Sequence, residues 1–239
     1  MTHLEEWIGL ISVIIPIFNE GRILESFLRN LVKQPGDAEI LLADGGSTDG
    51  TLEVISRFPE VRLVRSGGGR GRQMNDGAQQ AQGEILFFLH ADAYLPPEAF
   101  SKIQKALDDP AVSAGSFFLE FDHPGTMFKI LSLFSRINHP FFTYGDQGLF
   151  LRAGTFKKIG GFKEIPVMED VEIQGRLRKI GKFVKLAPPV VTSARRYLQN
   201  GPLRQHWITT GVVLLYHLGV SPHLLGRRYY RKRGKGESR

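Results

Sequence analysis

The chain has 239 residues, of which 42% are hydrophobic, and it carries a formal net charge of +7 with no cysteine. This composition suits one α/β domain with a hydrophobic core and excludes a disordered chain, a disulfide framework and a thiolate metal site. Residues 227–239 hold seven Lys or Arg and one Glu, which leaves the rest of the chain close to neutral. We therefore expect a single domain, 1–226, with a basic tail, 227–239, and no nucleic-acid partner.

The first residues predict the start of the fold and not a targeting segment. Glu5 and Glu6 stand where a signal peptide carries positive charge, and the apolar run that follows leads directly into Pro16. Together with the absence of cysteine, this indicates a cytoplasmic protein.

Strand and helix patterns alternate through the first half of the chain. The apolar runs 11–18, 38–44, 61–66 and 84–92 are typical of buried strands. Three helices are predicted between and after these strands. One has helical spacing of apolar residues at 23–31, a short one at 47–58 would be capped by Thr48 or Asp49, and one of small residues lies at 72–81. This alternation predicts an α/β fold with a doubly wound, mostly parallel sheet flanked by helices.

The second half is less regular. Its patterns predict a strand at 112–121, a helix at 126–137, a strand at 147–152 and a helix at 169–180 that ends at Gly181. No internal repeat or proline-rich linker interrupts them, so a single domain is expected.

Each strand of the first half ends in polar residues. Because parallel strands present their carboxyl ends at one edge of a sheet, these residues are expected to gather there. They offer carboxylates for ribose hydroxyls and a metal, backbone groups for a base and arginines for phosphates, which suits a nucleoside diphosphate. The groups are Pro16, Asn19 and Glu20; Asp44, Gly46 and Asp49; Arg70, Arg72 and Asn75; and His90 and Asp92.

Six segments in order resemble family-2 glycosyltransferases of the GT-A fold: "SVIIPIFNE", "LLADGGSTDGT", "GRGRQMNDGA", "FLHAD", "YGDQGLFLRAGTFKKIGGF" and "MEDVEIQGRLRKIG". The resemblance covers residues 12–196, with a nucleotide-binding half at about 10–110 and an acceptor half at about 111–200. "HAD" and "SARRY" are also similar to a small bacterial subgroup associated with arsenosugars. The resemblance implies a metal-dependent inverting glycosyltransferase that uses a nucleotide diphosphate sugar as donor.

The resemblance also implies which residues bind the nucleotide. Other interpretations remain open, because "DGGSTDG" forms a turn whatever its ligand, Asp49 caps a helix equally well, and the arginines suit solvated loops. The spacing of the glycines does not match a dinucleotide fingerprint or a P-loop. The implied nucleotide-binding residues are Pro16, Asn19, Glu20, Asp44, Gly46, Arg70, Arg72, Asn75, His90, Ala91, Arg195 and Arg196.

The metal prediction depends on Asp92. A hard cation such as Mg²⁺ or Mn²⁺ binds through one or two carboxylates and phosphate oxygens. The family pattern is usually Asp-x-Asp, whereas this chain has His90-Ala91-Asp92. Since Mn²⁺ accepts imidazole more readily than Mg²⁺ does, His90 is a metal ligand, a donor to one, or a packing residue at the strand end.

The catalytic base is expected at Glu169 or Asp170. An inverting transfer needs a carboxylate that removes the proton of the acceptor hydroxyl. In the family the second acid of this pair has that role, which implies Asp170, and Asp146 matches a position near the acceptor and the donor sugar. Acidic residues also occur in the first turn of a helix simply because they complement the helix dipole. That structural role is compatible with a role as the catalytic base. Retaining glycosidases also use two carboxylates, but adjacent acids rarely face one substrate.

Two rival functions remain open. A sugar-phosphate nucleotidyltransferase would share the sheet, but it would require a basic, glycine-rich loop directly after the first strand, which "PIFNEGR" matches poorly. A non-catalytic, membrane-associated scaffold with a degenerate transferase fold is the other, and retention of Asp92 and Asp170 argues against it.

Residues 207–220 form an apolar stretch inside a C-terminal helix expected at about 202–220. Its 14 residues fall short of the about 20 that a spanning helix needs. Such a helix with a basic tail would bind an anionic membrane surface, which would place the protein on the inner face of the membrane near a lipid-linked acceptor. Alternatively, the helix packs on the core or forms a homodimer contact. The alternative to a lipid-linked acceptor is a small-molecule acceptor.

Overall fold

The computed structural model describes residues 9–231, with side chains through Arg227. The predictions for the first eight residues and for residues 232–239 of the basic tail lie outside this range.

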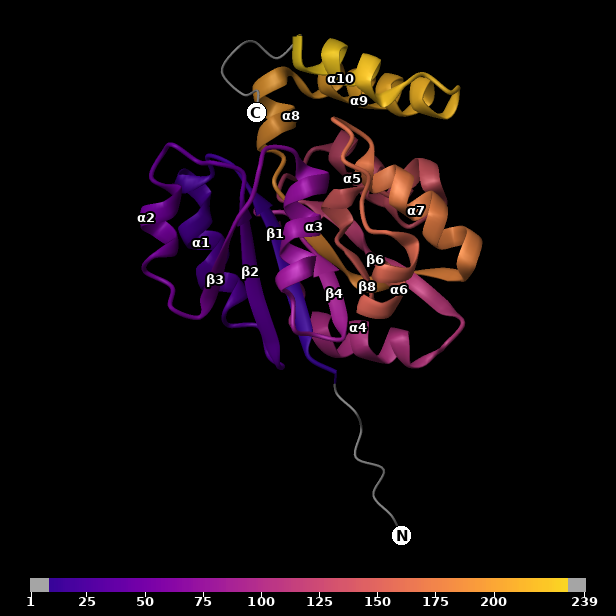
Figure 1. Ribbon diagram of the computed structural model, residues 1–239. Coiled ribbons are helices and arrows are strands. Elements are labelled where there is room, and N and C mark those ends of the chain that lie inside the picture. Colours follow the sequence, from indigo (N-terminus) through magenta and orange to yellow (C-terminus); the bar gives the residue numbers. More distant parts are fainter. Residues whose placement is uncertain (1–8, 232–239) are drawn as a thin grey trace.

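One eight-stranded sheet forms the centre of the protein, in the order β3-β2-β1-β4-β7-β6-β8-β5 (Figure 1). The first four strands pair in parallel, as expected. The second half is mixed, because β7 is antiparallel to β4 and β6, and β5 is antiparallel to β8. The strands are β1 Ile11–Ile17, β2 Ala38–Asp44, β3 Val61–Arg65, β4 Ile85–Phe88, β5 Ala93–Tyr94, β6 Val112–Phe121, β7 Leu149–Arg152 and β8 Lys182–Thr192.

Every helix predicted from the sequence is present, and the one expected at 72–81 begins two residues earlier. The helices α4, α6, α8 and α10 and the strands β5 and β8 were not expected, and α10 runs across the domain boundary predicted at residue 226. The helices are α1 Gly21–Leu31, α2 Thr51–Ile55, α3 Arg70–Gln80, α4 Ala99–Asp108, α5 Thr126–Ser135, α6 Ala153–Ile159, α7 Glu169–Ile180, α8 Arg195–Asn200, α9 Pro202–His217 and α10 Pro222–Arg231, with 3₁₀ turns η1 Pro140–Phe142 and η2 Gly145–Gln147.

Both faces of the sheet are buried, which explains the continuous apolar strands. On one face Val13 and Ile15 pack with Phe27 of α1, and on the other Ile14 packs with Met74 of α3. A methyl group on Gly77 would lie 2.5 Å from Ile14 Cγ2, so α3 needs small residues to approach β1.

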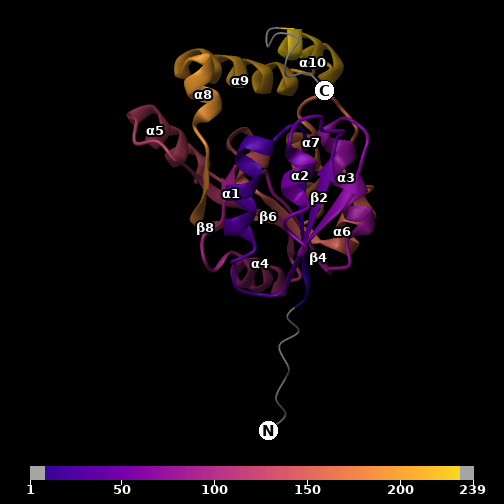
Figure 2. The same ribbon diagram turned by 90° about the vertical axis from the view of Figure 1, so that its left-hand side faces the viewer.

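Helices α8, α9 and α10 form a layer across one end of the domain (Figures 1 and 2). It is the end at which the parallel strands terminate, opposite the start of β1. Within this layer, the side chains of Val213 in α9 and Leu225 in α10 are buried. A methyl group on Gly226 would lie 2.8 Å from Pro166, so α10 packs closely on the loop before α7. No helix within residues 9–231 is long and apolar enough to cross a membrane.

Candidate active site

The loops after β1 and β2 are bonded to each other. The backbone N–H of Asn19 donates to Ser47 Oγ at 2.9 Å, and Asn19 Oδ1 accepts from Thr48 N at 2.8 Å. Asn19 adopts a left-handed conformation (φ 55°), which asparagine tolerates better than most residues. Gly50 occupies the N-cap position of α2, but Asp49 bonds the start of that helix, because its Oδ1 accepts from Thr51 N at 2.9 Å. Its Oδ2 accepts from Gly21 N at 3.1 Å and supports the same junction.

Asp44, the last residue of β2, holds the turn that follows it. Its carboxylate accepts from the backbone N–H of Gly46 at 3.2 Å and of Ser47 at 3.1 Å. Gly46 has φ 93°, a conformation that favours glycine. The interpretation of this segment as a turn is therefore confirmed. The turn holds the carboxylate of Asp44 at the carboxyl edge of the sheet.

Gln73 joins the ends of the same two strands from α3. Its Nε2 donates to Ile17 O at 2.7 Å and to Ala43 O at 2.8 Å, and the side chain is buried. Sequence reasoning missed this residue, because a single Gln within a helix of small polar residues carries no distinguishing signal.

Arg70, the first residue of α3, lies between two predicted site residues. One of its terminal nitrogens contacts His90 Nε2, and its Nε lies 3.3 Å from Glu169 Oε1. Burial, together with the charges of Arg70 and Arg196, lowers the pKa of His90 well below its ordinary value, so the imidazole is neutral. Burial raises the pKa of Glu169 to about 6; Arg70 opposes this rise and Asp170 adds to it.

Asp170 is held at the N-terminus of α7. Its Oδ2 accepts from Gly145 N at 2.6 Å and its Oδ1 from Val171 N at 2.8 Å. The preceding Met168 has φ 68°, a strained conformation for a residue with a side chain. Strain of this kind persists where surrounding structure imposes it, often at functional sites.

Gly145 marks the point where the predicted residues converge. A methyl group on its α-carbon would lie 3.0 Å from His90 Nε2, 3.2 Å from Asp170 Oδ2 and 3.3 Å from an Arg70 nitrogen. Three elements distant in sequence (the end of β4, α3 and α7) thus meet at η2. Nothing in the sequence singled out Gly145 for this contact.

The carboxylate of Asp146, beside Gly145, is only partly compensated. Its Oδ1 is buried without a hydrogen-bond partner. Burial, with added repulsion from Asp170 and Asp92, raises its pKa to about 7, although Arg196 and Arg70 oppose the rise. The site therefore concentrates carboxylates that a cation would stabilise.

Glu20 extends the site toward the loops after β1 and β2. Its Oε2 lies 3.6 Å from an Arg195 nitrogen. Burial is the largest cause that raises its pKa; Asp92 acts in the same direction, while Arg195 and Arg196 lower it. The two arginines of α8 thus act electrostatically on the carboxylates of the site and are not isolated surface charges.

Four of the predicted nucleotide-binding residues have their own contacts or places in the fold, and their role in binding stays a prediction. Asn75 bonds the backbone N and O of Phe162 at 2.8 and 2.9 Å, and Arg72 pairs with Asp76 at 3.8 Å. The other two, Pro16 and Ala91, lie within strand β1 and in the hydrophobic core.

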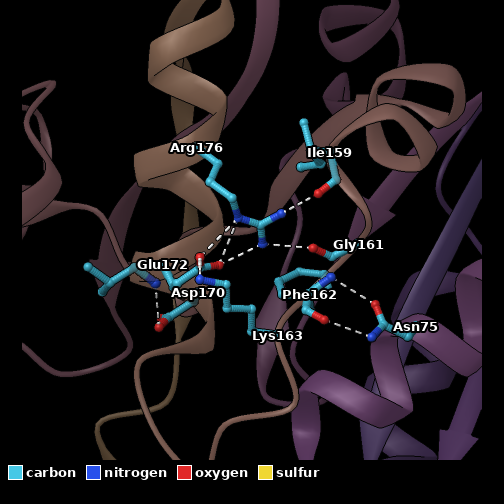
Figure 3. Close-up of polar contacts among 9 residues, drawn as sticks. Asn75, Ile159, Gly161, Phe162, Lys163, Asp170, Glu172 and Arg176 are labelled. Atoms are coloured by element: carbon cyan, nitrogen blue, oxygen red, sulfur yellow. Dashed lines mark hydrogen bonds and ion pairs between the residues drawn. The ribbon is translucent and has the colours of Figure 1, made fainter. Parts of the chain in front are cut away.

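A polar clamp fixes α7 to the loop before it (Figure 3). Arg176 donates to Ile159 O at 2.6 Å and Gly161 O at 2.7 Å, and its guanidinium pairs with Glu172. Lys163 completes the clamp, 2.7 Å from Glu172. Because Asn75 bonds Phe162, the clamp connects α7, which carries Asp170, to α3, which carries Arg70.

Within the part of the chain that the structure describes, no three His, Asp or Glu side chains are grouped closely enough to hold a metal ion by themselves. Diphosphate oxygens are suitable ligands of a divalent cation.

The profile of the family "Glycosyl transferase family 2" matches residues 12–158. An uncharacterised protein of Mycobacterium tuberculosis is 33% identical over 108 residues, 43% of this chain and 34% of that protein. The poly(ribitol-phosphate) beta-N-acetylglucosaminyltransferase TarS of Staphylococcus aureus is 28% identical over 107 residues, 41% of this chain and 19% of TarS. The matched segment thus spans a minor part of each of these relatives.

Solved structures share the fold. The mannosyltransferase PcManGT of Pyrobaculum calidifontis, in complex with GDP-Man and Mn²⁺, aligns with a TM-score of 0.62 and 24% identity over 77% of this chain and 56% of that chain. Residues 1–349 of S. aureus TarS, in complex with UDP, align with a TM-score of 0.63 and 21% identity over 77% of this chain and 60% of that chain. The predicted GT-A-type fold is thus confirmed.

Proposed function

The chain belongs to glycosyl transferase family 2, and on that premise we propose that it transfers a sugar from a nucleoside diphosphate sugar to a hydroxyl group of an acceptor, with inversion at the anomeric carbon. The observation that carries the proposal is the convergence of Arg70, His90 and Asp170 on Gly145. It brings an arginine suited to phosphate, a metal-ligand candidate and a carboxylate base to the carboxyl edge of the sheet, where ligands of such folds bind.

Asp170 is proposed as the catalytic base. Two backbone N–H donors orient its carboxylate at the N-terminus of α7, where a negative charge complements the helix dipole. It would take the proton of the acceptor hydroxyl as the oxygen bonds to the anomeric carbon and the bond to the diphosphate breaks. Glu169 is turned toward Arg70 and is proposed to position that arginine.

The donor is proposed to lie between two groups of residues. The positive charge for the diphosphate would come from Arg70, Arg195 and Arg196. A guanidinium group forms strong hydrogen bonds with phosphate oxygens. On the side of the loops after β1 and β2, Glu20 and Asp44 supply carboxylates for the nucleoside. The bonds of Asn19 across these loops and the turn at Gly46 hold that side in place before the donor arrives.

A divalent cation fits this chemistry. The unpartnered oxygen of Asp146 and the mutual repulsion of Asp92, Asp146 and Asp170 indicate a deficit of positive charge. Asp92 would hold the cation, with His90 beside it, and the diphosphate would provide the other ligands. Such an ion neutralises charge that develops on the leaving nucleoside diphosphate. The complex of PcManGT with GDP-Man and Mn²⁺ supports this choice.

A thermal-shift screen with nucleoside diphosphates and their sugars, with and without Mn²⁺ or Mg²⁺, tests the donor site. A ligand that binds only the native state must raise Tm. We expect one nucleotide to raise Tm and the metal to enlarge the rise. The absence of a shift with every nucleotide, from folded protein, would contradict the proposal.

A further inference from the structure

Helix α9 exposes four large apolar residues, although its inner side also buries the apolar Val213. Its inner side carries the buried Gln205, which bonds Asn200 at 2.9 Å and Thr209 at 3.1 Å. Its outer side carries four large apolar residues at helical spacing, which we call the outer face of α9: Leu203, Trp207, Leu214 and Leu218, with 69, 71, 50 and 72% of their surfaces exposed. A helix packed on a protein in water normally has the opposite arrangement.

Helix α5 adds a second exposed apolar group, the α5 flank, which consists of Leu133, Phe134 and Ile137. Aromatic contacts connect it to α9. Phe134 stacks on Phe142 of η1 at 5.4 Å between ring centres, and the adjacent Phe141 stacks on His217 of α9 at 4.0 Å. The apolar surface therefore runs from α5 through η1 to the end of α9. A continuous exposed apolar surface of this kind marks an interaction site.

The two segments that carry this surface are basic, although Glu120 and Asp122 line the pocket beside Leu133 and Arg136. No Asp or Glu lies between Asp122 and Asp146, the segment that contains α5, or between Glu172 and Glu237, the segment that contains α9 and α10. Exposed basic residues lie in both segments: Lys129, Arg136, Arg204 and Arg227. A partner must therefore offer negative charge beside an apolar region.

We propose that the outer face of α9, with the α5 flank, docks onto an anionic lipid bilayer. A bilayer offers hydrocarbon to the leucines, an interface to Trp207 and anionic headgroups to the basic residues. A second copy of the chain on this surface would bring two acid-free, basic segments together, which is unfavourable. Figures 1 and 2 show that α9 lies across the end of the domain at which the parallel strands terminate. If the proposed transferase function holds, the docked surface is therefore on the side of the site, and a lipid-linked acceptor follows.

Vesicle flotation of the full chain tests the docking surface. We expect binding to vesicles of phosphatidylcholine mixed with phosphatidylglycerol, and weaker binding both to phosphatidylcholine alone and at high salt. The variant Leu214→Ser/Leu218→Ser should lose at least about tenfold in vesicle affinity, because two apolar side chains no longer enter the interface. Ile180→Ser is the matched control, since Ile180 is 48% exposed at the end of α7, outside this surface.

The emission of Trp207 provides a second readout. In a Trp7→Phe background Trp207 is the only tryptophan, and its emission should shift to shorter wavelength on anionic vesicles. Equal binding by the double variant, or no binding by the native chain, would overturn the proposal. So would a dimer in light scattering that the double variant abolishes. Vesicle binding needs no donor, so its failure is distinguishable from failure of the donor screen.

Discussion

The carboxylate of Asp170 accepts a hydrogen bond from the backbone N–H of Gly145 at 2.6 Å. The bond connects residues 25 positions apart in sequence and fixes the N-terminus of α7 against η2. A proton acceptor at this position is thus oriented before any substrate binds, which is what a general base requires.

Asp170→Asn should lower the rate of sugar transfer on the order of 10³-fold, because an amide cannot accept the proton of the acceptor. Donor binding, measured as the Tm rise with the nucleotide, should persist. The exposed Asp108 at the end of α4 provides the control, and Asp108→Asn should transfer normally. An Asp170→Asn variant with the native rate would exclude this residue as the base.

Gly145→Ala should impair transfer more than it impairs folding. The new methyl group would meet His90, Asp170 and Arg70 at 3.0 to 3.3 Å, so these side chains must shift. We expect kcat to fall about tenfold or more, with a loss in the free energy of unfolding of at most ~2 kcal/mol.

Gly154→Ala is the matched control for this substitution. A methyl group on Gly154 has no neighbour within 4 Å, so kcat and stability should remain near native. Equal kcat for both variants would show that the approach at Gly145 has no role in transfer.

Asp146 should make the metal-free protein less stable as pH rises. Its folded pKa is about 7 against an ordinary value of 3.8, so the folded state binds this proton more tightly. The stability that the proton provides is complete below about pH 4 and is lost by about pH 7. Asp146→Asn should remove this dependence and be more stable than the native chain at pH 8, by at least about 1 kcal/mol.

Urea unfolding at pH 5 and pH 8, with a chelator present, measures this difference. Asp108→Asn should leave the pH dependence unchanged. If Asp146→Asn retains the full native dependence, the charge of Asp146 is compensated in the folded protein.

The Arg176 clamp should contribute far more to stability than a surface ion pair of the same spacing. Arg176 is 25% exposed and Glu172 10%, whereas Arg29 and Glu25, also four residues apart on a helix, are 66% and 38% exposed. Arg176→Met should cost about 2–3 kcal/mol in urea unfolding and Arg29→Met less than about 1 kcal/mol. Similar losses for both would mean that the backbone bonds in Figure 3 contribute little.

The strands and the carboxyl edge of the sheet were predictable because both faces of β1 and β4 are buried, which leaves apolar runs such as residues 13–15 and 85–88. Strand β8 was not predicted because it contains Pro188 and Pro189, which are rare in strands. Helix α10 crossed the expected boundary because the basic residues were interpreted as a tail, whereas Leu225 packs inward.

Within the site, residues whose side-chain chemistry is distinctive, such as Asp170 and Arg70, could be predicted. Residues that act through the backbone or through shape, such as Gly145 and Met168, could not, because their role appears only when distant elements meet. Asn75 has a structural role that the sequence did not indicate, because its side chain bonds the backbone of Phe162.

The bonds of Asn19 to Ser47 and Thr48 make the loops after β1 and β2 one mechanical unit. Redesign of one loop alone would remove the hydrogen bonds through which it holds the other. An attempt to change the nucleoside preference by grafting loops from another transferase should therefore exchange residues 18–21 and 44–51 together, as a matched cassette.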